Sequence, residues 1–139
     1  MVKLKIKLDD GATMPTRAHE TDAGLDLYSR DNRWINMRGS AIFDTGVHVQ
    51  IPAGYVGILK SKSGLNVNHG LTSDGVIDSG YTGSIRVKLY NNSDTPYVIN
   101  KGDKISQLVI LPIESPLLQL VDEFEETERG ENGFGSSGR

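Results

Sequence analysis

Apolar and polar residues alternate with a period of two in several segments, and this pattern constrains the fold more than any other feature of the sequence. The clearest runs are Leu4, Ile6 and Leu8; Val47, Val49 and Ile51; and Ile85, Val87 and Leu89. Such alternation predicts half-buried β-strands. Turn residues separate the runs at short intervals, and apolar residues keep a helical spacing only briefly, around residues 63–70. The sequence therefore predicts an all-β sandwich, jelly roll or barrel.

The length and composition exclude several classes of protein. A chain of 139 residues is long enough for one core and too short for a second catalytic domain. The absence of cysteine excludes a disulfide framework and Cys-based zinc sites. No run approaches the ~20 apolar residues of a membrane span, and residues 1–8 are unlike a signal peptide. We therefore expect a cytoplasmic protein without a membrane partner.

The charge is distributed unevenly along the chain. A formal net charge of −3 argues against broad electrostatic binding of nucleic acid. Residues 45–73 contain no Asp or Glu, whereas residues 122–131 contain six acids. An anionic ligand is expected to be attracted to the first region and repelled by the second. His48 lies in the first region between two valines and is interpreted as a solvated strand residue.

The segment 75–83 is the strongest candidate for a ligand site. It has one carboxylate, Asp78, and one aromatic ring, Tyr81, among the glycines Gly75, Gly80 and Gly83. Glycine allows a positive φ or a close approach of backbone to a ligand. The two side chains are expected to line one concavity in a ligand-facing hairpin. The alternative, a structural hairpin in which Asp78 caps a turn, stays open on this segment alone.

A polar loop over residues 60–64 is a second candidate. Lys60, Lys62 and Ser63 precede a segment that could begin a short helix, and their donors could hold phosphate oxygens. An exposed polar turn is the simpler interpretation of this loop when it is considered alone.

The C-terminal end changes in character. Residues 122–139 are predicted to form a charged linker and a mobile, glycine-rich C-terminal lid, separate from a β domain over residues 1–121. Gly133, Gly135 and Gly138 match the pattern Gly-x-Gly-x-x-Gly, but a dinucleotide site requires this pattern between a strand and a helix of a βαβ unit. Arg129 and Phe134 are instead the parts of a lid over a charged, ring-bearing ligand.

Five short segments resemble, in order, the five motifs of the trimeric deoxyuridine triphosphate nucleotidohydrolase (dUTPase) family. They are residues 23–29, 62–65, 75–83, 102–108 and 129–138. The resemblance implies a jelly-roll-like β domain with a flexible tail. It also implies a homotrimer whose sites lie between subunits, with the tail of one chain closing over a site built by the other two. The chain departs from the family at Lys62, where Arg is usual, and at Gly80, where an acidic residue is usual. Lysine keeps the charge but loses the bidentate fork of arginine.

The same resemblance implies hydrolysis of dUTP to dUMP and pyrophosphate by Mg²⁺-assisted attack of water on the α-phosphorus. Asp78 would be the general base, and Asp26 would hold metal-bound waters. The backbone of Gly75, Val76 and Ile77 would read uracil, Tyr81 would exclude a 2′-hydroxyl, and Phe134 would stack on the base. The remaining substrate-binding residues would be Lys62, Ser63, Gly64, Gln107, Arg129, Gly135, Ser136 and Ser137.

Two other functions stay open at this point. A dCTP deaminase of related fold would need a carboxylate base for the ring, for which Asp78 is the one candidate. A non-catalytic or additional role as a nucleotide-switched regulatory binding protein is also compatible with the sequence.

Overall fold

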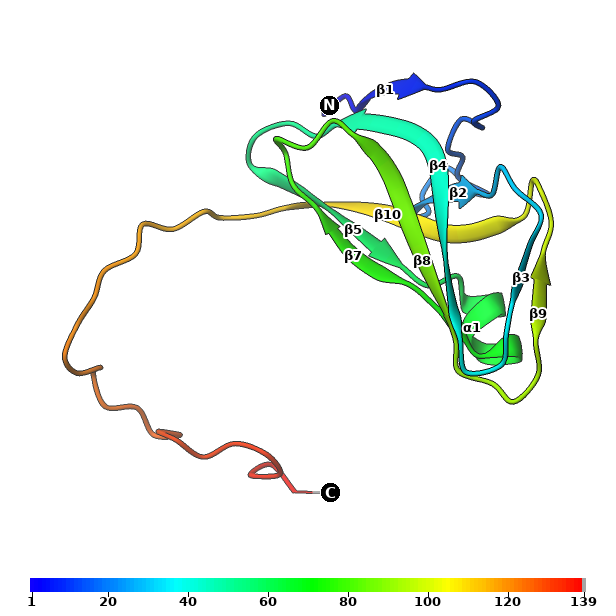
Figure 1. The fold of residues 1–139 in the computed structure, drawn as a ribbon. Helices are drawn as coiled ribbons and strands as arrows, with labels where there is room; N and C mark the ends of the chain where they lie inside the picture. The colour runs from blue at the N-terminus through cyan, green and yellow to red at the C-terminus, as the bar shows by residue number, and fades with distance from the viewer. Residues whose placement is uncertain (139) are drawn as a thin grey trace.

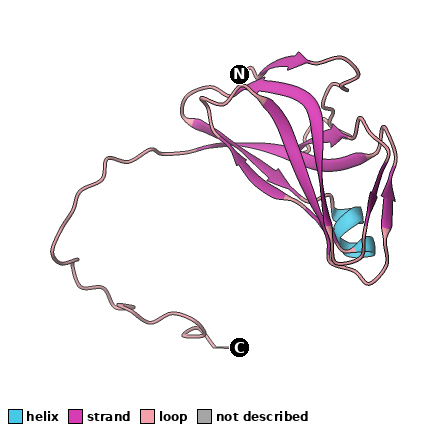
Figure 2. Ribbon diagram, viewed as in Figure 1, coloured by secondary structure: helices cyan, strands magenta, loops and turns pink. Residues whose placement is uncertain are grey.

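The computed structural model describes residues 1–138 and confirms the all-β prediction (Figures 1 and 2). One antiparallel sheet has the strand order β1 (Lys5–Leu8), β4 (Ser40–Gln50), β8 (Ser84–Asn91), β6 (Leu71–Thr72). The other has the order β2 (Gly24–Tyr28), β10 (Lys104–Pro112), β5 (Tyr55–Lys60), β7 (Asp74–Ile77). A two-stranded ribbon of β3 (Arg33–Ile35) and β9 (Tyr97–Ile99) flanks them. These two sheets form the jelly-roll-like domain expected from the sequence.

The alternating residues of β4 and β8 build the core. Val47, Val49, Ile85, Val87 and Leu89 are each at most 2% exposed, and the residues between them on β8 face outward. The first predicted strand differs, because Ile6 is only half-buried and Leu8 is 40% exposed. The reason is its position: β1 lies at the edge of its sheet and pairs with β4 alone.

The brief helical spacing around residues 63–70 corresponds to one short helix, α1 (Ser63–His69). It buries none of its residues, so little apolar contact stabilises it. Gly70 ends it in the left-handed conformation, with φ of 70°, and its N–H donates to the carbonyls of Asn66 and Leu65. Glycine is favoured at such a helix end because it has no Cβ.

The prediction of a hairpin within the segment 75–83 is wrong. β7 pairs with β5, whereas β8 pairs with β4 and β6. Residues 78–83 therefore cross from one sheet to the other, and we call them the 78–83 loop. Period-two patterns identify strands but carry no information on which strands pair, and so the sequence could not distinguish a hairpin from this crossing.

The chain leaves the body after β10 ends at Pro112 (Figure 1). Residues 113–138 contain no strand or helix, and their side chains are exposed almost throughout. The division of the chain at residue 121 and the mobility of the lid remain predictions. Among residues 1–138, no helix is both long and apolar enough to cross a membrane.

Substituting Gly57→Ala should lower the free energy of unfolding by about 1–3 kcal/mol, because β5 is packed tightly at this point. A Cβ there would lie 2.7 Å from Ile51 Cδ1, 2.9 Å from Leu108 Cδ1 and 3.2 Å from Ile77 Cβ. Urea denaturation at fixed protein concentration measures the change. Gly133→Ala, where a Cβ would meet nothing within 4 Å, is the matched control and should unfold like the parent. An unchanged midpoint for Gly57→Ala would contradict the packing argument.

Candidate active site

Two predicted site residues, Asp26 and Gln107, are neighbours on one face of the second sheet. Asp26 on β2 is opposite Gln107 on β10, and Gln107 is in turn opposite Lys60 on β5. Directly opposed residues of antiparallel strands share a face. The Gln107 Nε2 group donates to the carbonyl of Ser61 at 2.9 Å. The central strand β10 therefore positions the polar loop over residues 60–64, which we call the Lys62 loop.

The carboxylate of Asp26 is buried between two lysines. The residue is 3% exposed. Lys62 Nζ donates to its Oδ1 atom, and Lys104 Nζ lies 3.2 Å from Oδ2. The hydrogen bond to Asp26 raises the pKa of Lys104. Sequence reasoning missed Lys104, although it lies in the segment 102–108, because only the β2–β10 register brings it to Asp26.

A small network of serines lies beneath the same loop. Ser73 Oγ and Ser106 Oγ are 2.8 Å apart and buried. Ser106 Oγ donates to the carbonyl of Lys60 at 3.0 Å, and the Ser73 N–H donates to Ser61 Oγ at 3.0 Å. Single serines give no sequence pattern, so these contacts could not be anticipated. They fix the chain between β5 and α1.

The start of α1 presents the predicted anion-binding groups. Lys62 is the N-terminal capping residue without a side-chain cap, and the first turn carries no acid. Ser63 and Gly64 are exposed. Because the first N–H groups of a helix have no acceptor within it, they remain available, and together with the lysine they can bind anionic oxygens.

Strand β7 offers the backbone groups predicted to read a base. It is the edge strand of its sheet, with β5 as its one partner. The backbone N–H and C=O groups of alternate residues along 75–77 therefore point away from β5, and such an edge can pair with an extended or planar ligand. Val76 is 64% exposed.

Asp78 and Tyr81 follow directly in the 78–83 loop, and both are exposed. The Tyr81 N–H donates to the Asp78 carbonyl at 3.0 Å, and Tyr81 Oη donates to the Ser84 carbonyl at 2.8 Å. None of Gly75, Gly80 and Gly83 adopts a positive φ. At Gly83 the need for glycine is close approach, because a Cβ there would lie 2.5 Å from Tyr81 Oη.

Within one chain, the candidate phosphate-binding residues around Lys62 do not meet the candidates Asp78 and Tyr81. Lys60 is opposite Asp74 at the start of β7, whereas Gly57 is opposite Ile77 at its end. Since a strand rises ~3.3 Å per residue, about 13 Å of chain separates the level of Asp74 from Asp78. The Lys62 loop and the 78–83 loop therefore lie at opposite ends of the β5–β7 pair.

The tail residues form a third, separate set. Arg129, Phe134, Ser136 and Ser137 are exposed, and Gly135 lies among them with φ of 96°. Arg129 Nε donates within the tail, to the carbonyl of Asn132 at 2.7 Å. Figure 1 shows this segment away from the body. Within one chain it contacts neither of the other sets.

The candidate metal residue is Asp26. Residues 1–138 contain no cluster of three or more His, Asp or Glu side chains arranged to hold a metal ion. Both oxygens of Asp26 face lysines. This residue therefore fits a contact with metal-bound waters better than direct coordination, and Mg²⁺ characteristically keeps several waters.

The comparisons with known proteins agree on one family. A family model described as dUTPase matches residues 10–138. The deoxyuridine 5′-triphosphate nucleotidohydrolase of Clostridium kluyveri is 43% identical over 95% of this chain and 94% of its own length. The dUTPase of Staphylococcus bacteriophage 80alpha, solved with dUPNHPP, has a TM-score of 0.94 and 38% identity, with both chains fully covered. A mutant dUTPase of phage phi11 of S. aureus, whose structure reveals the coordination of a structural Mg(II) ion, has a TM-score of 0.83 and 36% identity over 90% of this chain and all of that one.

Proposed function

The chain belongs to the dUTPase family and is a dUTP diphosphatase, and we propose that it forms dUMP and pyrophosphate by attack of water on the α-phosphorus. The observation that carries this proposal is the family match over residues 10–138. The relative solved with dUPNHPP supports a nucleoside triphosphate ligand.

Asp78 is the proposed general base. Its side chain is exposed, and it follows directly on the open edge of β7. From there it would orient a water molecule and accept its proton, an effect of ~10²–10⁴ in rate.

The edge of β7 would select uracil. A backbone N–H can donate to O4 of uracil, and a backbone C=O can accept from N3–H. Cytosine presents the opposite order of donor and acceptor at these positions. Tyr81 would pack against the sugar, so that a 2′-hydroxyl has no room.

The Lys62 loop and Gln107 would bind the phosphates. An ammonium has three N–H donors, and Lys62 uses one on Asp26, which leaves two for phosphate oxygens. Gln107 has one amide N–H beyond its bond to Ser61. The N–H groups of Ser63 and Gly64 would complete this set of donors. Such donors matter because catalysis of phosphate transfer depends mainly on positioning and charge neutralisation.

Mg²⁺ is the proposed cofactor. Bound to the triphosphate, it would neutralise phosphate charge, and Asp26 would hold the waters around it.

A homotrimer with sites between subunits would account for the separation of the three sets of residues. A neighbouring subunit could bring its Lys62 loop to the open β7 edge, and the tail of a third could cover both. Arg129, Gly135, Ser136 and Ser137 would contact phosphates, and Phe134 would stack on the base and exclude water.

The assay that tests the proposal is pyrophosphate release from dUTP, UTP, dCTP and dTTP, with and without Mg²⁺. We expect turnover of dUTP with Mg²⁺ and little of the others, since packing alone rejects an added hydroxyl by ~10². Asp78→Asn should fold and bind dUTP but lose about 10²–10⁴ in rate. Comparable turnover of UTP would contradict the role of Tyr81, and near-parental turnover by Asp78→Asn would exclude it as the base.

Truncation after Thr127 should leave a folded trimer that binds Mg–dUTP but turns it over slowly. The segment removed is exposed and contributes nothing to the core, whereas Arg129 and Phe134 would each contribute about 1–3 kcal/mol to the closed site. Size-exclusion chromatography and steady-state kinetics measure the two effects. Phe134→Ala in the full chain should reproduce part of the kinetic loss. Aggregation of the truncated protein, or its dissociation to monomers, would show that the tail is needed for folding or assembly.

Mixed trimers test whether the tail acts on another subunit. Full-length Asp78→Asn chains and truncated chains with Asp78 intact should each be nearly inactive alone. Coexpressed in equal amounts, they should recover about a quarter of the parental sites, because random assembly joins an intact Asp78 with an intact tail at that frequency. Two preparations mixed after assembly serve as the control. No recovery on coexpression would show that each tail serves its own chain.

A further inference from the structure

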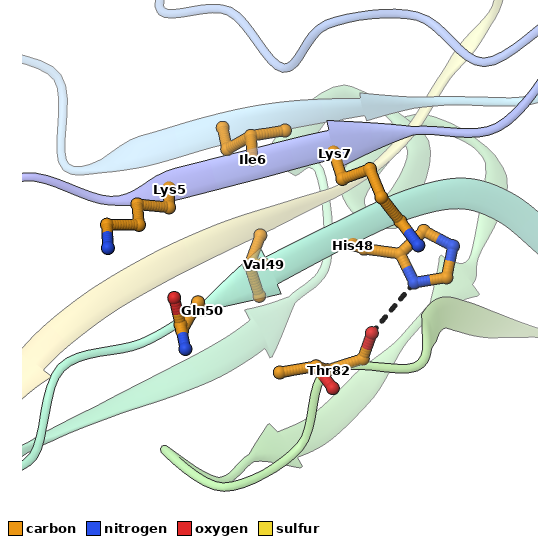
Figure 3. A pocket seen from close by; sticks show the side chains of 7 residues that line it. All are labelled: Lys5, Ile6, Lys7, His48, Val49, Gln50 and Thr82. Atoms are coloured by element: carbon orange, nitrogen blue, oxygen red, sulfur yellow. Dashed lines mark hydrogen bonds between the residues drawn. The ribbon is translucent and has the colours of Figure 1, made fainter.

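His48, interpreted from the sequence as a solvated strand residue, does lie on a strand, but it is half-buried rather than fully solvated. Its side chain on β4 is 16% exposed. Figure 3 shows the ring between the strand β1 and the 78–83 loop. The ring lines a surface pocket of about 290 Å³. The Nδ1 atom is 2.8 Å from the carbonyl oxygen of Thr82. The Nε2 atom is 3.0 Å from both carboxylate oxygens of Asp9.

Both partners of the ring are acceptors that have no hydrogen to donate. A neutral imidazole carries one N–H and one lone pair, so one of its nitrogens would face an oxygen without a proton between them. Only the imidazolium donates to the Thr82 carbonyl and the Asp9 carboxylate together. The two distances therefore favour a protonated His48.

The charges around the ring agree with this protonation state. The hydrogen bond to the Thr82 carbonyl, followed by that to Asp9, raises the pKa of His48, while desolvation and, less strongly, Lys7 oppose the shift. Lys7 is directly opposite His48 on β1, and Lys5 lines the same cavity. From β8 the opposed residue is Ser84, which does not ionise in this range.

The ring joins the 78–83 loop to a rigid part of the fold. Asp9 is itself fixed, because its N–H donates to the Gly46 carbonyl at 2.8 Å. His48 lies on a strand paired on both sides, with β1 and β8. Among the hydrogen bonds of residues 1–138, two join the 78–83 loop to residues outside it. One goes from Tyr81 to the adjoining Ser84, and the other goes from His48 to Thr82. Thr82 is adjacent to Tyr81.

We propose that His48, held as an imidazolium by Asp9, is a positioning residue that sets the 78–83 loop, and through Thr82 the ring of Tyr81, for nucleotide binding. The inference rests on the proposed role of this loop in the substrate site. On deprotonation the ring keeps one N–H, which the charged Asp9 carboxylate holds as the stronger acceptor, so that none is left for Thr82. Since the pKa of His48 is raised on folding, the hydrogen bond to Thr82 contributes fully below the unfolded pKa of ~6.5 and is lost as the pH rises through the folded value.

Three variants separate the parts of this arrangement. His48→Ala removes both hydrogen bonds. His48→Asn keeps a donor near the position of Nδ1 for Thr82 but cannot titrate. Asp9→Asn replaces the carboxylate by an amide, which can donate to Nε2, so that a neutral imidazole satisfies both neighbours. His69→Asn, at the end of α1 beside the Tyr97 ring, is the matched control.

The measurement is KM and kcat for Mg–dUTP between pH 6 and 9, with each variant compared with the parent at the same pH. For His48→Ala we expect KM to rise roughly tenfold at low pH, with a smaller change in kcat. The difference should shrink toward high pH as the parent loses its own contact. His48→Asn should recover most of the low-pH KM, and both it and Asp9→Asn should show a KM less dependent on pH than that of the parent. His69→Asn should follow the parent.

An NMR titration of the histidine ring protons tests the stabilisation of the His48 imidazolium by Asp9, which we call the anchor, without an activity assay. The chain has three histidines, and the His48→Asn and His69→Asn spectra assign them. The pKa of His48 should be above its ordinary value in the parent and fall in Asp9→Asn. A neutral His48 at pH 6, or a parental KM for His48→Ala across the range, would overturn the proposal. A parent that does not hydrolyse dUTP would instead refute the proposed function, while the titration would still report on the anchor.

Discussion

The pairing of β10 with β2 on one side and β5 on the other is the constraint on which the rest of the structure depends. It buries Leu108 completely in the core, and on the opposite face it aligns Asp26, Gln107 and Lys60 in one row. The same register brings Lys104 to the buried Asp26 carboxylate. A buried carboxylate is costly unless it is paired, and here its pairing with Lys62 and Lys104 ties the loop before α1 to the sheet. The core and the candidate anion-binding surface are thus two faces of one strand arrangement.

The second feature with functional consequences is the open edge of β7. Exposed edges are a liability that proteins usually cover or shorten, and β7 has only four residues. Its free backbone groups, followed at once by Asp78, suit recognition of a small planar molecule by main-chain hydrogen bonds. The distance along β5 and β7 from there to the Lys62 loop means that the two parts of the proposed site do not meet within one subunit. The proposed trimer would bring them together.

His48 connects this edge to the first sheet. A loop that crosses between sheets, with Gly80 and Gly83 in it, has few internal restraints, and the imidazole supplies one from a strand paired on both sides. Because both partners of the ring are acceptors, the restraint depends on a proton. In this way a residue outside the family motifs can influence residues within them.

The sequence by itself determined the all-β class, the segments that became β4, β8 and α1, and the family to which the chain belongs. Each of these depends on local information: the period of apolar residues, a glycine after a short helix, or side chains at short spacings. The candidate site residues and the lid remain predictions from that level. Only the tertiary structure decided that residues 78–83 cross between sheets, that Lys104 meets Asp26, and that the half-buried His48 lies between Asp9 and Thr82. These contacts join residues 34 to 78 positions apart in the chain, and they follow from strand register, which a period of two leaves undetermined.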